Sequence, residues 1–234
     1  MCGLGTAAAH VLRQVAAGGN EAFFVTHEPV AWMEDATVVA DELGIPHTRE
    51  SVNTVELPFE PDLIASVWYR NIIKAHVIDR VDGRIVNFHP SLLPRHRGCS
   101  SVPWAIIEGD DATGVTAHYI DPGVDTGRII AQRSTPISVE DTALSVYHRC
   151  LEIAGAMWSD TVDAVMSGAP GIAQSGAGCS HGRGAPYDGR IDPAWDREMT
   201  ERFIRAMTFP PLPYATFRGQ EIRSLRDYDR ALHP

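Results

Sequence analysis

The chain has 234 residues, 44% of them hydrophobic, which is enough for one α/β domain with an appendage or for two small domains, and argues against general disorder. Its formal net charge of −10 argues against DNA or tRNA as the main partner, because proteins that bind a phosphate backbone normally have a basic face. The four cysteines are widely spread, no signal peptide or membrane-spanning run is evident, and we therefore expect free thiols and a cytoplasmic protein.

The first part of the chain alternates between helical and strand patterns. Three segments are typical of helices: residues 5–19, 31–44 and 72–81. Three apolar runs have strand length: residues 21–27, 61–69 and 83–89. In the second helix, the expected apolar stripe is Trp32, Ala36, Val39 and Leu43. Strands that alternate with helices predict βαβ units and a mostly parallel sheet with helices on both faces.

The second part begins with two strand-like runs, residues 113–120 and 127–137, on either side of a loop rich in Gly and Asp. A long helix is predicted over residues 141–167, with apolar residues at steps of three and four. Small residues then dominate a linker or mobile loop. A helix over 194–207 with Phe203, Ile204 and Met207 facing inward and a hairpin over 214–225 follow. We expect a main domain over 1–168 and a C-terminal extension over 169–234.

The segment "VNFHPSLLP" places Asn87 and His89 at the end of a predicted buried strand. Side chains two apart share one face, and ligands of open parallel sheets bind beyond the carboxyl ends of the strands. The loop with Asp121 and Asp125 also follows a strand, so we expect it at the same edge. An amide, an imidazole and a carboxylate suit acyl transfer to an amine: two donors for an oxyanion, and a carboxylate that orients the imidazole.

Other interpretations of these residues remain open. An Asn-x-His pair at a strand end is more often hydrogen-bonded structure, and an Asp in a Gly-rich loop is more often a turn former. His96 and Cys99 are three residues apart, but no further metal ligands follow at suitable spacing, so we expect no metal site.

The stretches "NFHPSLLPRHRG" and "GVTAHYIDPGVDTGRIIAQ" resemble the catalytic core of the formyltetrahydrofolate-dependent formyltransferase family. The resemblance extends over roughly residues 3–225 and implies a Rossmann-like α/β fold with a C-terminal helix and hairpin. It implies a formyltransferase with N10-formyltetrahydrofolate as co-substrate and no metal. The catalytic residues carried over are Asn87, His89 and Asp125. The residues expected to contact the folate are Ile72, Ile73, Asp121, Gly123, Val124 and Gly127.

Three features favour the sugar-nucleotide branch of this family. "VWYRNII" resembles a segment of a bacterial enzyme that formylates UDP-4-amino-4-deoxyarabinose, and residues 188–217 resemble the segment after the core in sugar and tRNA enzymes. With the acidic balance of the chain, we also expect no basic domain of the kind that the tRNA enzymes add. The implied substrate is a nucleotide-linked amino sugar, in particular a dTDP-4-amino-4,6-dideoxyhexose, and the implied assembly is a homodimer. A formyltetrahydrofolate hydrolase and a non-catalytic nucleotide-binding relative are the alternatives.

Several further residues are candidates on the substrate side. Residues expected to contact the sugar nucleotide are Arg70, Arg95, Arg97 and Arg205. Arg95, His96 and Arg97 could face a diphosphate or form a solvated loop, and Arg205 could approach the nucleotide or cap a carbonyl. Tyr187 and Trp195 could stack on a base, although packing is favoured for both. His118 is expected to be a structural partner near the site.

The start of the chain differs from the pattern of the family. Members of the family usually begin with a central strand, whereas this chain opens at the following turn, "MCGLG". We therefore expect the first central strand to be missing. Its absence would leave two neighbouring strands with unpaired backbone groups, unless another segment fills the gap.

Overall fold

The computed structural model describes residues 1–29, 33–210 and 212–233. Contacts divide the chain into two compact units, each described here by itself. Unit 1 comprises Met1–His89, Val115–Arg133 and Leu151–Gly176, and unit 2 comprises Pro90–Gly114, Ser134–Cys150 and Ala177–Pro234. This division differs from the boundary expected after residue 168. The expected boundary stays a prediction.

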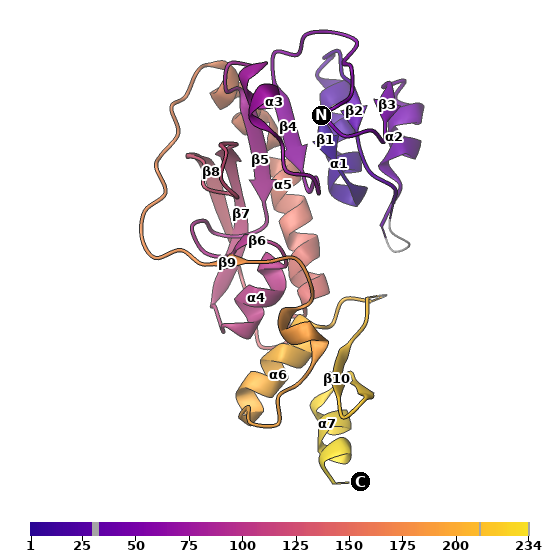
Figure 1. Cartoon of the computed structure of the whole chain (residues 1–234), viewed down its shortest axis with the longest axis vertical. Helices are drawn as coiled ribbons and strands as arrows, with labels where there is room; N and C mark the ends of the chain where they lie inside the picture. Colours follow the sequence, from indigo (N-terminus) through magenta and orange to yellow (C-terminus); the bar gives the residue numbers. More distant parts are fainter. Residues whose placement is uncertain (30–32, 211, 234) are drawn as a thin grey trace. The chain divides into compact units, whose positions relative to one another are not determined.

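The main sheet is mostly parallel, and helices accompany its strands (Figure 1). Its strands, in the order β3-β2-β1-β4-β5-β7-β8, are β1 (Cys2–Gly3), β2 (Phe24–Val25), β3 (His47–Thr48), β4 (Ile64–Val67), β5 (Ile85–His89), β7 (Ala112–Tyr119) and β8 (Ile129–Pro136). The pairs among β1 to β5 are parallel, whereas β5 and β7 are antiparallel. The predicted Rossmann-like α/β fold is confirmed.

The remaining elements are helices and two small sheets. The helices are α1 (Gly5–Ala17), α2 (Ala36–Glu42), α3 (Ala75–Asp79), α4 (Ser101–Ile107), α5 (Ala143–Met166), η1 (Pro186–Gly189), α6 (Arg197–Ala206) and α7 (Leu225–Leu232). The small sheets pair β6 (Arg97–Gly98) with β9 (Ser180–His181), and β10 (Ala215–Phe217) with β11 (Gln220–Ile222). The second pair is the predicted closing hairpin. No helix within the described ranges is long and apolar enough to cross a membrane.

The first central strand is present, so the expectation that it is missing was wrong. Cys2 pairs with Val25 of β2 and with Ser66 of β4. The Met1 carbonyl accepts a hydrogen bond from the Val25 N–H at 2.8 Å, and the Leu4 N–H donates to the Val67 carbonyl at 3.2 Å. Because β1 has only two residues, it pairs with the second half of β4, Ser66 and Val67.

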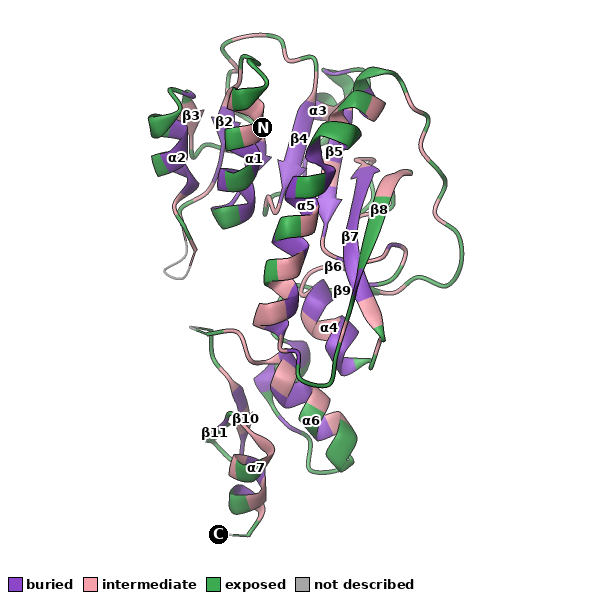
Figure 2. Cartoon of the chain, turned by 180° about the vertical axis from the view of Figure 1, so that it is seen from behind, coloured by how far each residue is buried: buried purple, intermediate pink, exposed green. Residues whose placement is uncertain are grey.

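Packing on both faces of the sheet follows from alternation along the strands. Phe24 and Val25 are neighbours on β2 and therefore point to opposite faces. Phe24 packs in a cluster with Leu12 of α1 and Val39 of α2, whereas Val25 packs in a second cluster with Val77 of α3. In Figure 2, β4 and β5 are mostly buried, as strands covered on both faces must be.

The helix predicted over 31–44 is shorter than expected. It begins at Ala36 because Asp35 caps it, its carboxylate accepting a hydrogen bond from the Thr37 N–H at 3.1 Å. Ala36 and Val39 are buried as predicted, whereas Leu43 is 37% exposed, so its place on the buried stripe was wrong. Trp32 lies outside the described residues.

Candidate active site

A row of polar side chains crosses three neighbouring strands of unit 1. Ser66 on β4 lies opposite Asn87 on β5, which lies opposite His118 on β7. The Ser66 hydroxyl donates to the Asn87 Oδ1 at 2.8 Å, and the Asn87 Nδ2 lies 3.2 Å from the His118 Nε2. Opposite residues of paired strands point to the same face. The candidate site therefore begins as a polar strip on one face of an otherwise apolar sheet.

These partners fix the orientation of the amide and the tautomer of the imidazole. The His118 Nδ1 lies 2.7 Å from the Tyr119 carbonyl oxygen, which can only accept, so Nδ1 carries a proton. In the neutral ring, Nε2 is then an acceptor for the Asn87 NH2. With Ser66 donating to its oxygen, Asn87 must direct its NH2 group toward His118 and the space beside it.

The third predicted catalytic side chain reaches this strip. The Asp125 Oδ1 accepts a hydrogen bond from the Asn87 Nδ2 at 3.3 Å and lies 3.4 Å from the His118 Nε2. Its Oδ2 lies 3.4 Å from the His89 Nδ1. The side chains of His89 and Asp125 are only 6% and 14% exposed. An amide, two imidazoles and a carboxylate thus converge in a largely water-excluded space, where electrostatic interactions are strengthened.

The route by which Asp125 arrives differs from the one expected. Because β7 is antiparallel to β5, Tyr119 at its end pairs with Val86, whereas His89 pairs with Thr116 in the middle of β7. The loop after β7 therefore leaves from the opposite end of β5, and the expectation that both segments end at the same edge of the sheet was wrong. Asp125 reaches His89 because the loop turns back along the strands.

Two contacts hold the loop in this reversed course. The Gln174 Nε2 donates to the carbonyl oxygens of Asp125 and Gly127, both at 2.8 Å. Gly127 lies so close to β7 that a Cβ there would be 1.7 Å from the Tyr119 carbonyl oxygen. Asp125 itself has φ of +52°, a left-handed conformation that Asp tolerates better than most residues. The carboxylate is thus positioned by the backbone of the loop.

The residues expected on the folate side are spread over different environments. The Asp121 carboxylate accepts hydrogen bonds from the Gly123 N–H at 3.0 Å and the Thr126 hydroxyl at 2.6 Å, so Asp121 is a turn former. Val124 is 47% exposed and Ile72 65% exposed, whereas Ile73 is 6% exposed and packs in the core. The folate contacts of these residues stay predictions.

The arginines expected on the substrate side lie in both units. Arg70 is in unit 1, where its backbone N–H donates to the His27 Nε2 at 3.2 Å. Arg95, Arg97 and Arg205 are in unit 2. Arg95 pairs with two carboxylates of its own unit, and the Arg97 N–H donates to the Cys179 carbonyl at 3.0 Å.

Three other residues adopt one of the two alternatives left open by the sequence. The Arg205 Nη1 donates to the Asp141 carbonyl oxygen at 2.7 Å, which is a capping contact, and its contact with the sugar nucleotide stays a prediction. Tyr187 and Trp195 pack against each other with ring centroids 4.9 Å apart. His96, by contrast, fits neither alternative, because it is 1% exposed and thus belongs neither to a solvated loop nor to an open surface.

Sequence reasoning missed two residues of the site. Ser66 is a lone hydroxyl in an apolar strand, and knowledge of the strand register would have placed it opposite Asn87. Gln174 lies in the segment of small residues that we interpreted as a linker or mobile loop, and no local pattern marks it. His118 is a partner of the site, as expected.

Comparison with known proteins identifies the family. A formyl transferase family model matches residues 19–162, which include all three predicted catalytic residues. The chain belongs to the formyl transferase family. The chain is 40% identical over 160 residues to a GDP-perosamine N-formyltransferase from Brucella melitensis, an alignment that covers 68% of this chain and 62% of the relative. It is also 31% identical over 198 residues to a methionyl-tRNA formyltransferase from Citrifermentans bemidjiense, covering 81% of this chain and 62% of that relative.

Solved formyltransferases share the fold. The N-formyltransferase from Helicobacter canadensis, in complex with folinic acid and dTDP-3-aminofucose, is 20% identical to this formyltransferase chain with a TM-score of 0.77. The alignment covers 95% of this chain and 84% of the Helicobacter chain. A second solved structure, of a sugar 3N-formyl transferase, aligns with 95% of this chain and 83% of its own. The chain spans about 62% of the length of the curated relatives it matches. The resemblance to the sugar-nucleotide branch of the family is confirmed.

Proposed function

We propose that this formyltransferase moves a formyl group from N10-formyltetrahydrofolate to the amine of a nucleotide-linked amino sugar. The observation that supports it most is the convergence of Asn87, His89 and Asp125 on one face of the sheet, within a chain of this family. The site needs no nucleophilic side chain, because an amine attacks the formyl carbon directly.

In the proposed reaction, the free amine of the sugar forms a bond to the formyl carbon. The carbonyl oxygen becomes an oxyanion, for which a protonated His89 and the Asn87 NH2 are the donors. Collapse of this tetrahedral species breaks the bond between the formyl carbon and N10 of the folate. The amine has lost a proton and N10 gains one, so the net reaction is balanced.

Asp125 has two roles in this mechanism. Its carboxylate lies at ion-pair distance from the His89 Nδ1, and an opposite charge at that distance favours the protonated ring. It also lies near the position of the attacking amine and assists removal of its proton. The hydrogen bond from the Asn87 Nδ2 to Asp125 gives way to the oxyanion as that charge develops.

Formylfolate is the proposed donor because the family relatives of known structure include complexes with 5-N-formyl-THF and with folinic acid. The sugar is proposed as a dTDP-4-amino-4,6-dideoxyhexose. The name of the Brucella relative, GDP-perosamine N-formyltransferase, makes a GDP-linked amino sugar the closest rival for the carrier nucleotide. A cytoplasmic location and a homodimer are further parts of this proposal.

The experiment that tests the proposal is a panel of amino sugars linked to dTDP, GDP or UDP, each incubated with the protein and N10-formyltetrahydrofolate. Mass spectrometry reads the gain of a formyl group on the sugar nucleotide. A formyl adduct on at least one sugar nucleotide, absent with the Asp125→Asn variant, supports the proposal. Release of formate without any amino sugar, and no adduct across the panel, would contradict it and favour hydrolysis.

A further inference from the structure

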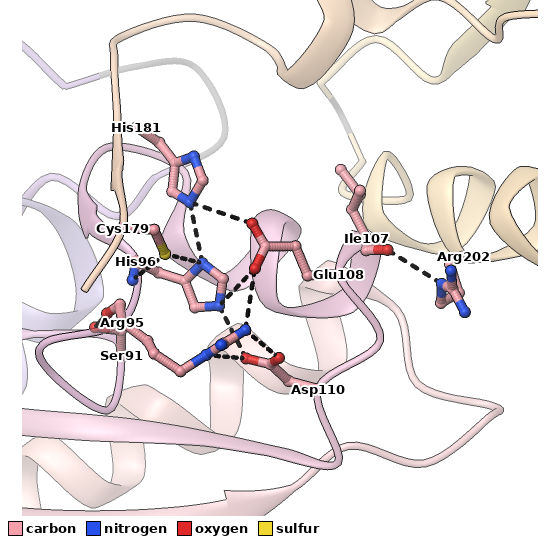
Figure 3. A network of polar contacts seen from close by, with 9 residues as sticks. All are labelled: Ser91, Arg95, His96, Ile107, Glu108, Asp110, Cys179, His181 and Arg202. Atoms are coloured by element: carbon pink, nitrogen blue, oxygen red, sulfur yellow. Dashed lines mark hydrogen bonds and ion pairs between the residues drawn. The ribbon is translucent and has the colours of Figure 1, made fainter. Parts of the chain in front are cut away.

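Unit 2 contains a cluster of four potential metal ligands that the mechanism does not use (Figure 3). We name it the His–Cys cluster, and its members are His96, Glu108, Cys179 and His181. One ligand atom from each residue lies within 4.8 Å of the others. From the sequence we considered only the pair His96 and Cys99 and expected no metal site there, whereas in the structure His96 lies beside Glu108, Cys179 and His181.

Strand pairing brings the two halves of the cluster together. β6 and β9 run in parallel, with Arg97 opposite Ser180 and Gly98 opposite His181. His96 precedes β6 and Cys179 precedes β9, so this short pairing places their side chains next to each other. Gly98 permits the close approach, because a Cβ there would lie 2.3 Å from the His181 carbonyl oxygen.

The protonation of His96 directs a lone pair into the cluster. The His96 Nε2 lies 2.9 Å from a carboxylate oxygen of Asp110, which accepts only, so Nε2 carries the proton. In the neutral ring, Nδ1 is then unprotonated. It lies 3.0 Å from the His181 Nε2 and 3.6 Å from the Cys179 Sγ. Three good metal-binding atoms therefore face one another.

The fourth atom is a carboxylate oxygen of Glu108, which lies 3.9 Å from the His181 Nε2. Two neutral imidazoles, one thiolate and one carboxylate bring two negative charges, which match a divalent cation. This charge balance distinguishes the cluster from a group of acidic residues on a surface. His96 is buried, with 1% of its surface exposed, Cys179 and His181 are partly buried, and Glu108 is exposed.

The surroundings of the cluster resemble the outer contacts of metal sites. A histidine that binds a metal usually donates its other N–H to a carboxylate, as His96 does to Asp110. Arg95 holds that carboxylate in place with hydrogen bonds to both of its oxygens. The Cys179 Sγ accepts a hydrogen bond from the His96 backbone N–H at 3.1 Å. The His181 ring stacks on Trp104 with centroids 4.3 Å apart.

We propose that His96 Nδ1, Cys179 Sγ, His181 Nε2 and a Glu108 carboxylate oxygen bind one zinc ion. Zinc bonds of about 2.0–2.3 Å in a tetrahedron place the ligand atoms roughly 3.3–3.7 Å apart, and three pairs of ligand atoms here lie 3.0, 3.6 and 3.9 Å apart. Four protein ligands leave no open position, so the ion is structural. It fastens the segment around residues 179–181, which the sequence suggested to be a mobile linker, to the segment 96–108.

The test begins with metal analysis of the purified full chain after incubation with zinc chloride and extensive dialysis. We expect about one zinc ion per chain, as for a closed structural site. Cys179→Ser and His181→Ala should lose the zinc, whereas Cys99→Ser, the matched control for removal of a thiol, should retain it. Asp110→Asn should weaken zinc binding by about 10- to 100-fold.

A second measurement on the unmodified chain covers the case in which the cluster variants do not fold. Zinc should slow alkylation of Cys179 by iodoacetamide, as located by peptide mass spectrometry, and leave the rate at Cys99 unchanged. Bound cobalt should give a thiolate charge-transfer band. A chain that retains no zinc and shows equal alkylation of Cys179 with and without zinc would overturn the proposal. The cluster would then be a hydrogen-bonded pair of histidines.

Discussion

The side chain of Asn87 shows how single residues determine the chemistry of the site. An amide has one accepting end and one donating end, and only its donating end can stabilise an oxyanion. Ser66 occupies the accepting end, and His118 and Asp125 face the donating end. The orientation of Asn87 is therefore set by a hydroxyl on the neighbouring strand.

We predict that Ser66→Ala lowers kcat for formyl transfer by about 10- to 100-fold, because the amide loses its fixed orientation and the oxyanion its aligned donor. The KM for the sugar nucleotide should stay the same, since Ser66 is 4% exposed beneath Asn87. Steady-state kinetics with both substrates varied would measure kcat and KM separately.

Thr113→Val is the matched control for the Ser66 variant. The Thr113 hydroxyl is also buried on a strand of the sheet, and among the described residues it has no hydrogen-bond partner. Its removal should leave kcat unchanged and stability equal or higher. Equal kcat values for Ser66→Ala and the unmodified chain would show that Ser66 does not position Asn87.

The sequence predicts this site in part. Asn87 and His89 follow from the period of two along a strand, and Asp125 follows from the family resemblance. Ser66 requires the strand register, which depends on the pairing of β4 with β5 and is not a local property of the sequence. Gln174 acts on a loop 49 residues earlier in the chain, a contact that only the tertiary fold creates.

At the scale of elements, the loop between β7 and β8 determines where the carboxylate lies. We predict that Gly127→Ala abolishes most formyl transfer, because its Cβ would overlap the Tyr119 carbonyl oxygen and force the loop, with Asp125, away from His89. Gly182→Ala is the control, since nothing lies within 4 Å of a Cβ at that position. Full activity of the Gly127 variant would contradict the proposed role of the loop.

The start of α5 is held by an ion pair in unit 2. Two nitrogens of the Arg149 guanidinium donate to the two Asp141 carboxylate oxygens at 2.7 and 2.8 Å. These hydrogen bonds, with others from Ser138 and Ser145, outweigh partial burial and hold the pKa of Asp141 well below its usual range. The Asp141 carboxylate therefore stays charged in the folded protein at pH values at which the same group in the unfolded chain is already protonated.

We predict that Asp141→Asn lowers the free energy of unfolding by about 1–3 kcal/mol near neutral pH. Because the folded pKa is depressed, the stabilisation is present above the unfolded pKa and is lost as the pH falls toward the folded pKa. The difference between the two proteins should be constant above about pH 5 and narrow below about pH 4. Urea unfolding over a pH series measures it, and a difference that grows in acid would contradict the assignment.

Elements with a clear pattern in the sequence were predicted well, whereas two elements without one, β1 and α4, were not. The helix expected over 141–167 is α5, and the hairpin around Arg218 and Gly219 is present. β1 escaped prediction because two residues show no pattern. α4 contains Pro103 within its first turn, which hid its helical character, and its burial among other elements of unit 2 overrides this weak propensity.

At the scale of the whole molecule, the net charge of this chain bears on a choice between two substrate classes that similarity alone does not make. The chain matches both a GDP-perosamine N-formyltransferase and a methionyl-tRNA formyltransferase. With a formal net charge of −10, it lacks the excess of cations that a tRNA backbone would require.

We predict no formylation of initiator methionyl-tRNA and no binding of tRNA at physiological salt, as measured by gel shift and by mass spectrometry of the released amino acid. The same preparation should formylate an amino sugar nucleotide. Faster formation of formyl-methionyl-tRNA than of the formylated sugar nucleotide would contradict the assignment to the sugar-nucleotide branch.

The most direct test of the account compares Asp125→Asn with the unmodified chain. The substitution keeps the shape of the side chain and removes the charge 3.4 Å from the His89 Nδ1. We predict that turnover of the sugar nucleotide identified in the panel falls by about 10²- to 10⁴-fold, while its affinity, measured by calorimetry, is unchanged. Turnover that persists at the level of the unmodified chain would contradict a catalytic role for Asp125 and the formyl-transfer site built on it.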